Sequence, residues 1–103
     1  MILQIFHAPG PGIYRLVGEL DYASQRDMKS FFADAAGSGE DLVLDVSGLR
    51  FVDAFGLRCL VELAESLTDP SRLILQSPTA EVRRLIDAAS MDRLAALEIR
   101  DSD

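Results

Sequence analysis

The residues best placed to do chemistry are Asp53, Ala54, Phe55 and Gly56, which follow an apolar run and open a helical pattern over residues 57–67. A helix N-terminus exposes unpaired N–H groups and a partial positive charge, so it readily receives an anion or a phosphorylated side chain. Phe55 carries a benzyl ring and Ala54 a methyl group, and neither can be esterified. The sequence therefore predicts that no phosphate is added at this helix start.

The rest of the sequence contains no recognisable combination of catalytic residues. The single histidine, His7, lies in the first expected strand, so no Ser/His/Asp arrangement is expected. The stretch 37–39 is glycine-rich, but it lacks the lysine and hydroxyl residue that follow in a phosphate-binding loop. We therefore expect a protein that is not an enzyme and that needs no cofactor.

Metal and thiol chemistry are also disfavoured. One cysteine, Cys59, and one histidine exclude an internal disulfide and argue against a zinc cluster. Cys59 lies among leucines of a helical pattern and is interpreted as a buried apolar residue. Asp21, Asp45 and Asp53 could meet at one sheet edge around magnesium, but magnesium usually accompanies a phosphate-bearing substrate. We therefore expect no metal site.

The same acidic residues have simpler structural roles. Asp53 is expected to cap the helix that follows it, and its charge suits the helix dipole. Asp21 is expected to cap a helix over about residues 22–36. Asp45, in an otherwise apolar strand, should hydrogen-bond the turn that follows. Gly56 either lets backbone or a partner approach closely or is merely tolerated at a helix start.

The elements that must position these residues follow the order β-β-α-β-α-β-α-β. Strand–helix–strand units require parallel neighbours, and the turn Pro9–Gly12 between the first two strands predicts a hairpin. Residues 42–46 are nearly all apolar, which favours a central strand buried on both faces and ending in a turn at Ser47–Gly48. Ser77 and Pro78 should start the next helix as cap and first residue. The expected elements are strands at about 2–7, 13–18, 42–46, 72–76 and 97–99 and helices at about 22–36, 55–67 and 78–89.

Length and composition point to one globular domain. The chain has 103 residues, 49% hydrophobic and 26% charged, and a formal net charge of −7. Its dispersed arginines and acidic balance argue against direct nucleic-acid binding. No apolar run reaches the roughly 20 residues that a membrane-spanning helix needs, and the first residues favour a strand over a signal peptide. We expect a single domain over 1–103, located in the cytoplasm and not inserted in a membrane.

The stretch Asp45-Val-Ser-Gly-Leu-Arg-Phe-Val-Asp-Ala-Phe-Gly-Leu57 resembles the central motif of the STAS domain, specifically that of the bacterial anti-sigma factor antagonists. In that family a strand ends in Asp-Leu-Ser-Gly, an apolar pair follows, and Asp-Ser-Ser-Gly-Leu opens a helix. The Gly18–Asp21 turn and the segments 77–85 and 91–94 also resemble family features. The resemblance implies an α/β fold with a mixed sheet of about five strands, an N-terminal hairpin, and three to four helices mostly on one face.

The resemblance also implies a partner. In that family an anti-sigma factor, usually a GHKL-type serine kinase, binds the STAS protein and thereby releases a sigma factor. The kinase then phosphorylates the second hydroxyl residue of the motif, and this breaks the complex. That position falls on Phe55, and the preceding serine falls on Ala54. The implied partner-binding set comprises Asp21, Asp53, Ala54, Phe55, Gly56 and Arg58.

Two questions stay open at the level of sequence. Phe55 could anchor a partner, because aromatic residues are favoured at interfaces, or its ring could fold back over the strand ends and fill the core. Other functions are also compatible with the fold: an accessory subunit of an ABC-type membrane transporter, or a domain that senses a nucleotide or a lipid. The oligomeric state is not predicted.

Overall fold

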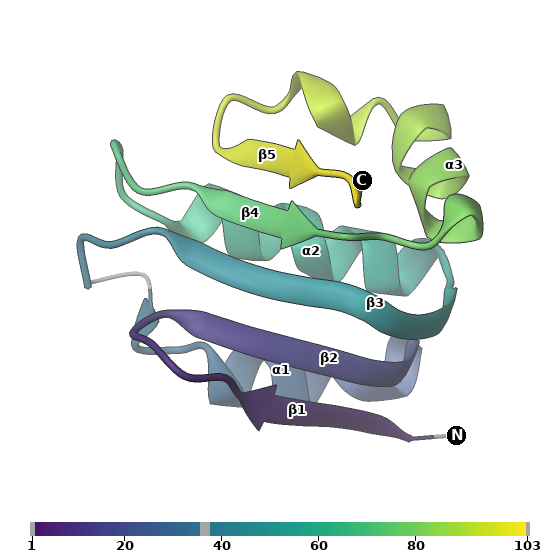
Figure 1. The fold of residues 1–103 in the computed structure, drawn as a ribbon, viewed down its shortest axis with the longest axis horizontal. Coiled ribbons are helices and arrows are strands. Elements are labelled where there is room, and N and C mark those ends of the chain that lie inside the picture. Colours follow the sequence, from purple (N-terminus) through teal and green to yellow (C-terminus); the bar gives the residue numbers. More distant parts are fainter. Residues whose placement is uncertain (1, 36–37, 103) are drawn as a thin grey trace.

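A computed structural model describes residues 2–35 and 38–102 and shows one five-stranded sheet with the strand order β1-β2-β3-β4-β5 (Figure 1). The order of strands and α-helices is the one predicted from the sequence. The strands are β1 (Leu3–His7), β2 (Ile13–Leu20), β3 (Leu42–Val52), β4 (Leu73–Gln76) and β5 (Leu97–Arg100). The helices are α1 (Gln25–Phe31), α2 (Ala54–Ser66) and α3 (Ala80–Ala88), with short 3₁₀ turns η1 (Tyr22–Ser24) and η3 (Met91–Arg93).

The sheet is mixed, as predicted. β1 pairs antiparallel with β2, while β2, β3, β4 and β5 run parallel to one another. Parallel strands end at the same edge of a sheet, so the segments that follow β2, β3 and β4 leave from one edge. This edge carries both Asp21 and Asp53, which directly follow β2 and β3.

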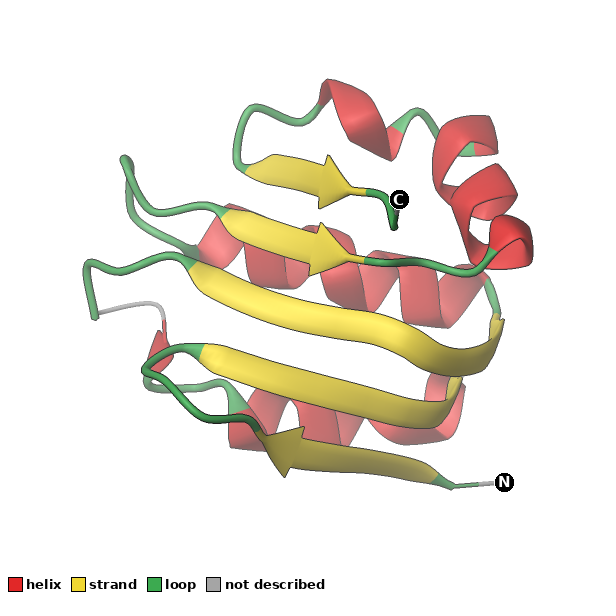
Figure 2. Ribbon diagram, in the orientation of Figure 1, coloured by secondary structure: helices red, strands yellow, loops and turns green. Residues whose placement is uncertain are grey.

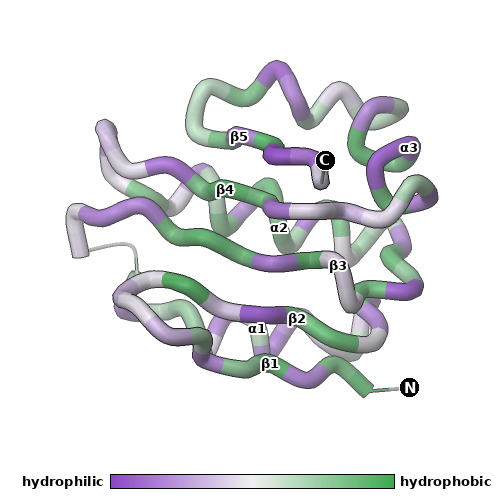
Figure 3. The backbone as a smooth tube through the Cα atoms, in the orientation of Figure 1, coloured by the Kyte–Doolittle hydropathy of each residue, from purple (hydrophilic) through white to green (hydrophobic). Residues whose placement is uncertain are grey.

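Helices α1 and α2 cover one face of the sheet and lie behind it in Figure 2, which confirms the expected one-sided packing. The core lies between these layers and includes Leu16 on β2, Leu44 on β3 and Leu60 on α2, all fully buried. Figure 3 shows hydrophobic residues along β4 and the first half of β3, in the middle of the sheet. Burial of these apolar side chains is the main stabilising contribution to such a fold.

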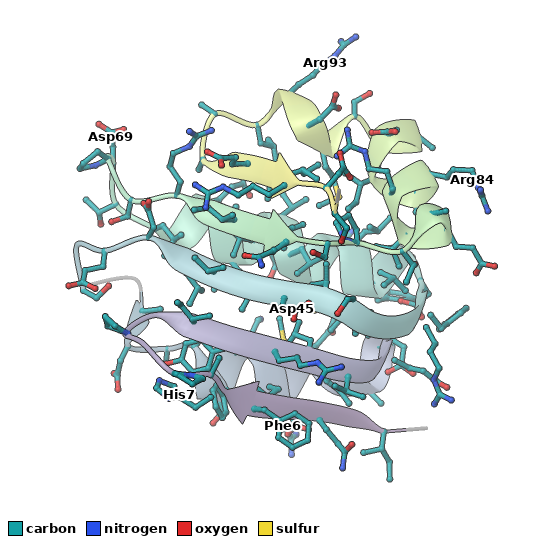
Figure 4. The ribbon with its side chains drawn as sticks, viewed as in Figure 1. Phe6, His7, Asp45, Asp69, Arg84 and Arg93 are labelled. Carbon is teal, nitrogen blue, oxygen red and sulfur yellow. The ribbon has the colours of Figure 1, made fainter. Side chains whose placement is uncertain are left out.

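In the described part of the chain, the opposite face of the sheet has no helix over β1–β3 and carries both polar and apolar side chains. Asp45 and Phe6 lie on this uncovered face in Figure 4. Arg72, which directly precedes β4, places its Nη1 3.1 Å from Oε1 of Glu98 on β5. Ile74 pairs in register with Glu98 and is nevertheless 3% exposed, so long polar side chains shield it from water.

The prediction of a turn at Ser47–Gly48 is wrong, because β3 continues unbroken to Val52. Burial alternates along β3, so the expected burial on both faces is also wrong. The register between β3 and β2 shifts at two places, and the first shift falls next to Gly48. A strand can absorb extra residues as bulges without ending, which explains why a Ser-Gly pair does not turn the chain.

The first helix is shorter than predicted. The 3₁₀ turn η1 precedes α1, and α1 ends at Phe31. The expected end at Ala36, with Gly37, lies outside the described residues. The residue after α1, Phe32, has left helical geometry at φ −104° and ψ 15°, and its buried ring packs in the core.

The start of α3 also differs from the prediction. Thr79, not Ser77, caps this helix, and its hydroxyl accepts a hydrogen bond from the Val82 N–H at 3.2 Å. Ser77 remains tied to the sheet, because its N–H donates to the Arg100 carbonyl at 2.7 Å. The helix can therefore begin only after Ser77 has left the strand edge.

Candidate functional site

The candidate site lies where β2 and β3 end side by side. The Asp53 N–H donates a hydrogen bond to the Leu20 carbonyl at 3.2 Å, which fastens the start of α2 to the end of β2. The connection after β2 leads into η1 and α1, and the connection after β3 leads into α2. The two connections therefore present their first residues on one surface.

Asp53 caps α2 as predicted. Its backbone is extended at φ −97° and ψ −176°, and its Oδ1 accepts from the Gly56 N–H at 2.8 Å. Its carbonyl accepts from the Leu57 N–H at 2.9 Å. The Asp53 carboxylate is thus engaged within the chain and holds the first turn of α2 rigid.

We expect Asp53→Ala to lower the free energy of unfolding by about 1 kcal/mol, because the Gly56 N–H then loses its acceptor. Asp53→Asn is the matched control, since it keeps an acceptor oxygen and should cost less. Urea unfolding followed by circular dichroism measures both variants. An alanine variant as stable as the wild type would show that the cap does not stabilise this helix.

Gly56 is buried, and the group that approaches it closely is the Leu20 carbonyl of the same chain and not a partner. A Cβ atom at this position would lie 2.1 Å from the Leu20 carbonyl oxygen. Of the roles considered for Gly56, the structure therefore supports close backbone approach: its lack of a side chain lets α2 pack against the end of β2. Its contribution to any surface is indirect, through the position of Phe55.

Phe55 lies at the surface, 44% exposed, and outside the hydrophobic core of the described residues. Its ring meets that of Tyr22, which is 67% exposed, edge to face at a centroid distance of 5.1 Å and an interplanar angle of 86°. Aromatic rings favour this geometry. The two side chains therefore form an exposed aromatic pair that joins η1 to the first turn of α2.

Tyr22 is a site residue that sequence reasoning missed. The sequence predicts it only as the first residue of a helix, and its contact with Phe55 joins segments that are far apart in the sequence. The signal that could have found it is its position directly after Asp21, which the resemblance places near the motif helix. An exposed tyrosine beside an exposed phenylalanine is a common feature of binding surfaces.

Asp21 precedes η1 and caps it through reciprocal hydrogen bonds with Ser24. The Asp21 N–H donates to Ser24 Oγ at 3.2 Å, and Ser24 Oγ lies 3.1 Å from Asp21 Oδ1. Asp21 therefore caps a 3₁₀ turn and not the long helix predicted. The buried hydroxyl of Ser24 also lies 3.1 Å from the Glu19 carbonyl, which ties the turn to β2.

Ala54 and Arg58 complete the predicted set, and both are exposed on α2. They are four residues apart, so they lie on the same side of the helix. The structure thus brings Asp21, Asp53, Phe55 and their neighbours to one edge of the sheet. Within this set, the exposed apolar area comes mainly from Phe55, and Tyr22 extends it.

Asp45 does not join this edge. It lies in the middle of β3 and faces the uncovered side of the sheet, where its Oδ1 accepts from the Ser47 N–H at 3.0 Å. The predicted local hydrogen bond is therefore present, although it lies within a strand and not in a turn. Among the described residues, no group of three or more His, Cys, Asp or Glu side chains could hold a metal ion.

Cys59 is buried on α2, as predicted. Burial raises the pKa of its thiol above the ordinary value of a cysteine, and the nearby Glu62 carboxylate acts in the same direction. A protonated, buried thiol is a poor nucleophile at neutral pH. His7 lies on the edge strand β1, with its ring 4.8 Å from that of Tyr14.

Comparisons with known proteins agree with this geometry. The family model described as the STAS domain matches residues 3–102. No curated protein sequence matches the chain significantly. Within the described residues, no helix is both long enough and apolar enough to cross a membrane.

Three solved structures share the fold. A Thermotoga maritima protein assigned as an anti-sigma factor antagonist is 21% identical, with a TM-score of 0.74 over 98% of this chain and 86% of that chain. The anti-sigma factor antagonist SpoIIAA, in its unphosphorylated form, is 17% identical, with a TM-score of 0.69 over 99% and 90%. An anti-sigma factor antagonist from Mycobacterium paratuberculosis is 21% identical, with a TM-score of 0.68 over 94% and 86%.

Proposed function

Because the chain belongs to the STAS domain family, we propose that it is an anti-sigma factor antagonist that docks its partner through the surface around Phe55. The observation that carries this proposal is the exposed Phe55 ring at the start of α2, paired with Tyr22. Large aromatic side chains on a rigid support are typical anchors of protein interfaces. The proposed surface comprises Asp21, Tyr22, Asp53, Ala54, Phe55 and Arg58, with Gly56 beneath it.

The proposed partner is an anti-sigma factor with a GHKL-type serine kinase fold. Binding of the chain would occupy the anti-sigma factor and release its sigma factor. The resemblance places the phosphoacceptor position on Phe55, which has no hydroxyl. The anti-sigma factor antagonist SpoIIAA, which shares the fold of this chain, is described in an unphosphorylated form. In this chain docking would persist, while release by phosphorylation at position 55 would be impossible.

The proposed role is regulatory and not catalytic. The chain would act in the cytoplasm as a single domain, without metal, cofactor or direct contact with nucleic acid. Its formal net charge of −7 suits a partner with a basic or mixed surface. The signal that ends docking must then act elsewhere, through abundance, a second partner or a ligand.

The test of this function starts from purified complexes of anti-sigma factors from the source organism with their sigma factors. Adding the chain to the cognate complex should release the sigma factor, which fluorescence anisotropy of a labelled sigma factor would detect. The released amount should saturate at one chain per anti-sigma factor. The absence of both release and binding with every anti-sigma factor of that organism would overturn the proposed function.

A further inference from the structure

Strand β1 forms one outer edge of the sheet, and among the described residues no strand pairs with it on the side away from β2 (Figure 1). Its five residues, Leu3–His7, include no aspartate, glutamate, lysine or arginine, although 26% of the chain is charged. Proteins usually protect such an edge with charged side chains, proline, a bulge or a covering segment, because its unpaired backbone groups can pair with another strand. We propose that a second copy of this chain pairs with β1 and forms a two-fold symmetric dimer.

The other outer edge of the sheet, β5, has the protection that β1 lacks. Glu98 and Arg100 alternate with apolar residues along β5 and form an ion pair with each other. Arg72 joins this pair, with its Nη1 3.1 Å from Glu98 Oε1. Charged side chains on an edge strand oppose the approach of another sheet, because they would lose contact with water on pairing. The contrast between the two edges selects β1 as the edge that pairs.

The backbone of β1 determines the direction and register of the pairing. The Ala8 N–H donates a hydrogen bond to the Ile13 carbonyl at 2.9 Å, and β1 and β2 are antiparallel in the same register. Backbone groups alternate in direction along such a pair, so Leu3, Ile5 and His7 direct their N–H and C=O groups away from β2. These three residues are spaced evenly about Ile5. A second β1 running in the opposite direction therefore places Ile5 opposite Ile5 and His7 opposite Leu3, in a self-complementary arrangement.

The side chains on the helix side of β1 suit this pairing. Leu3 and Ile5 line a shallow groove with Asp27 and Phe31 of α1, and the Phe31 ring is 47% exposed. The His7 of the second copy would stand opposite Leu3, on the same side of the sheet as Asp27. A histidine N–H can donate to a carboxylate, and the two-fold symmetry repeats this contact at the other end. The dimer would thus place a histidine, and not another acid, beside Asp27 in a protein with a net charge of −7.

The uncovered face of the sheet continues across the same interface. Phe6 lies on this face and is 49% exposed, and Gln4 shares the face because side chains alternate along a strand. In the pairing centred on Ile5, the Gln4 of one chain lies opposite the Phe6 of the other. β1 contributes no residue to the Phe55 surface, so this inference goes beyond the proposed function and does not depend on it.

Sedimentation equilibrium of the purified chain tests the dimer. We expect twice the mass of one chain, with a Kd of about 100 μM or below. Amide hydrogen exchange then locates the interface in the wild type. The Ile5 N–H, which points away from β2, should exchange rapidly in dilute samples and slowly where the dimer dominates. A chain that stays monomeric at about 0.5 mM, or a dimer in which the Ile5 N–H exchanges as fast as in the monomer, would overturn the proposal.

Two matched double variants test the register. Gln4→Lys/Phe6→Lys places like charges opposite each other across the proposed interface, whereas Gln4→Lys/Phe6→Glu places opposite charges there. We expect the dimer Kd of the first to exceed that of the second at least about ten-fold. Both positions are exposed, so both variants should fold, and circular dichroism verifies this. The first variant also has the smaller net negative charge, so long-range repulsion alone predicts the reverse order. Equal Kd values, or a tighter dimer of the first variant, would overturn the proposed pairing.

Discussion

Replacing Phe55 by aspartate should abolish tight binding of the anti-sigma factor and leave the fold intact. The ring is 44% exposed and lies outside the core, so its removal costs little folding energy. An aspartate in the first turn of α2 also gains about 0.3–1 kcal/mol from the helix dipole. At an interface, in contrast, losing an aromatic anchor costs about 2 kcal/mol or more, which is about thirty-fold in affinity.

Calorimetric titration of the anti-sigma factor with the wild type and with Phe55→Asp measures this difference. Phe6→Asp is the matched control, because Phe6 is 49% exposed but lies on the edge strand β1, away from the site. Its affinity should equal that of the wild type. If Phe55→Asp kept wild-type affinity, the partner would dock elsewhere on the molecule.

Among substitutions that add one methyl group at this site, Gly56→Ala should lower the free energy of unfolding most. The new Cβ would lie 2.1 Å from the Leu20 carbonyl oxygen and 2.8 Å from its carbon, and both are backbone atoms that cannot rotate away. Helix α2 would have to move off the end of β2. This movement would strain the bond from the Asp53 N–H to Leu20 and loosen the core beneath α2. We expect a loss of about 3 kcal/mol.

Urea unfolding gives the free energy of unfolding for this variant. Gly39→Ala is the control, because a Cβ there would meet nothing within 4 Å, although its φ of +76° is unfavourable for alanine. It should lose no more than about 1 kcal/mol. A Gly56→Ala protein within that same margin of the wild type would show that α2 can shift freely against β2.

Local signals were sufficient for the order of the elements and for the cap at Asp53. Asp53 precedes an apolar helical pattern, and a cap interacts only with residues a few positions further along. The predicted turn at Ser47–Gly48 was wrong because Gly48 pairs with Val17 of β2, so the strand resumes directly after the register shift at Ser47. The predicted start of α3 was wrong for a similar reason, because the Ser77 N–H donates a hydrogen bond to the Arg100 carbonyl on the neighbouring strand.

For the candidate site, too, the sequence predicted some features and left others undecided. The sequence singled out Phe55 and Gly56, but it could not decide whether the ring was buried or what approached the glycine. Both answers depend on the end of β2, which is distant in the sequence. Tyr22 was missed because only the packing of η1 against α2 places its ring next to Phe55. Contacts between elements therefore determine the surface that the motif presents.

The most direct test of the central claim is to add magnesium and radiolabelled ATP to the preformed complex with the kinase-type anti-sigma factor. The wild-type complex should remain intact and its chain unlabelled, whereas the Phe55→Ser complex should take up phosphate at position 55 and dissociate. Labelled phosphate on the wild-type chain, or dissociation of its complex on addition of ATP, would contradict the account.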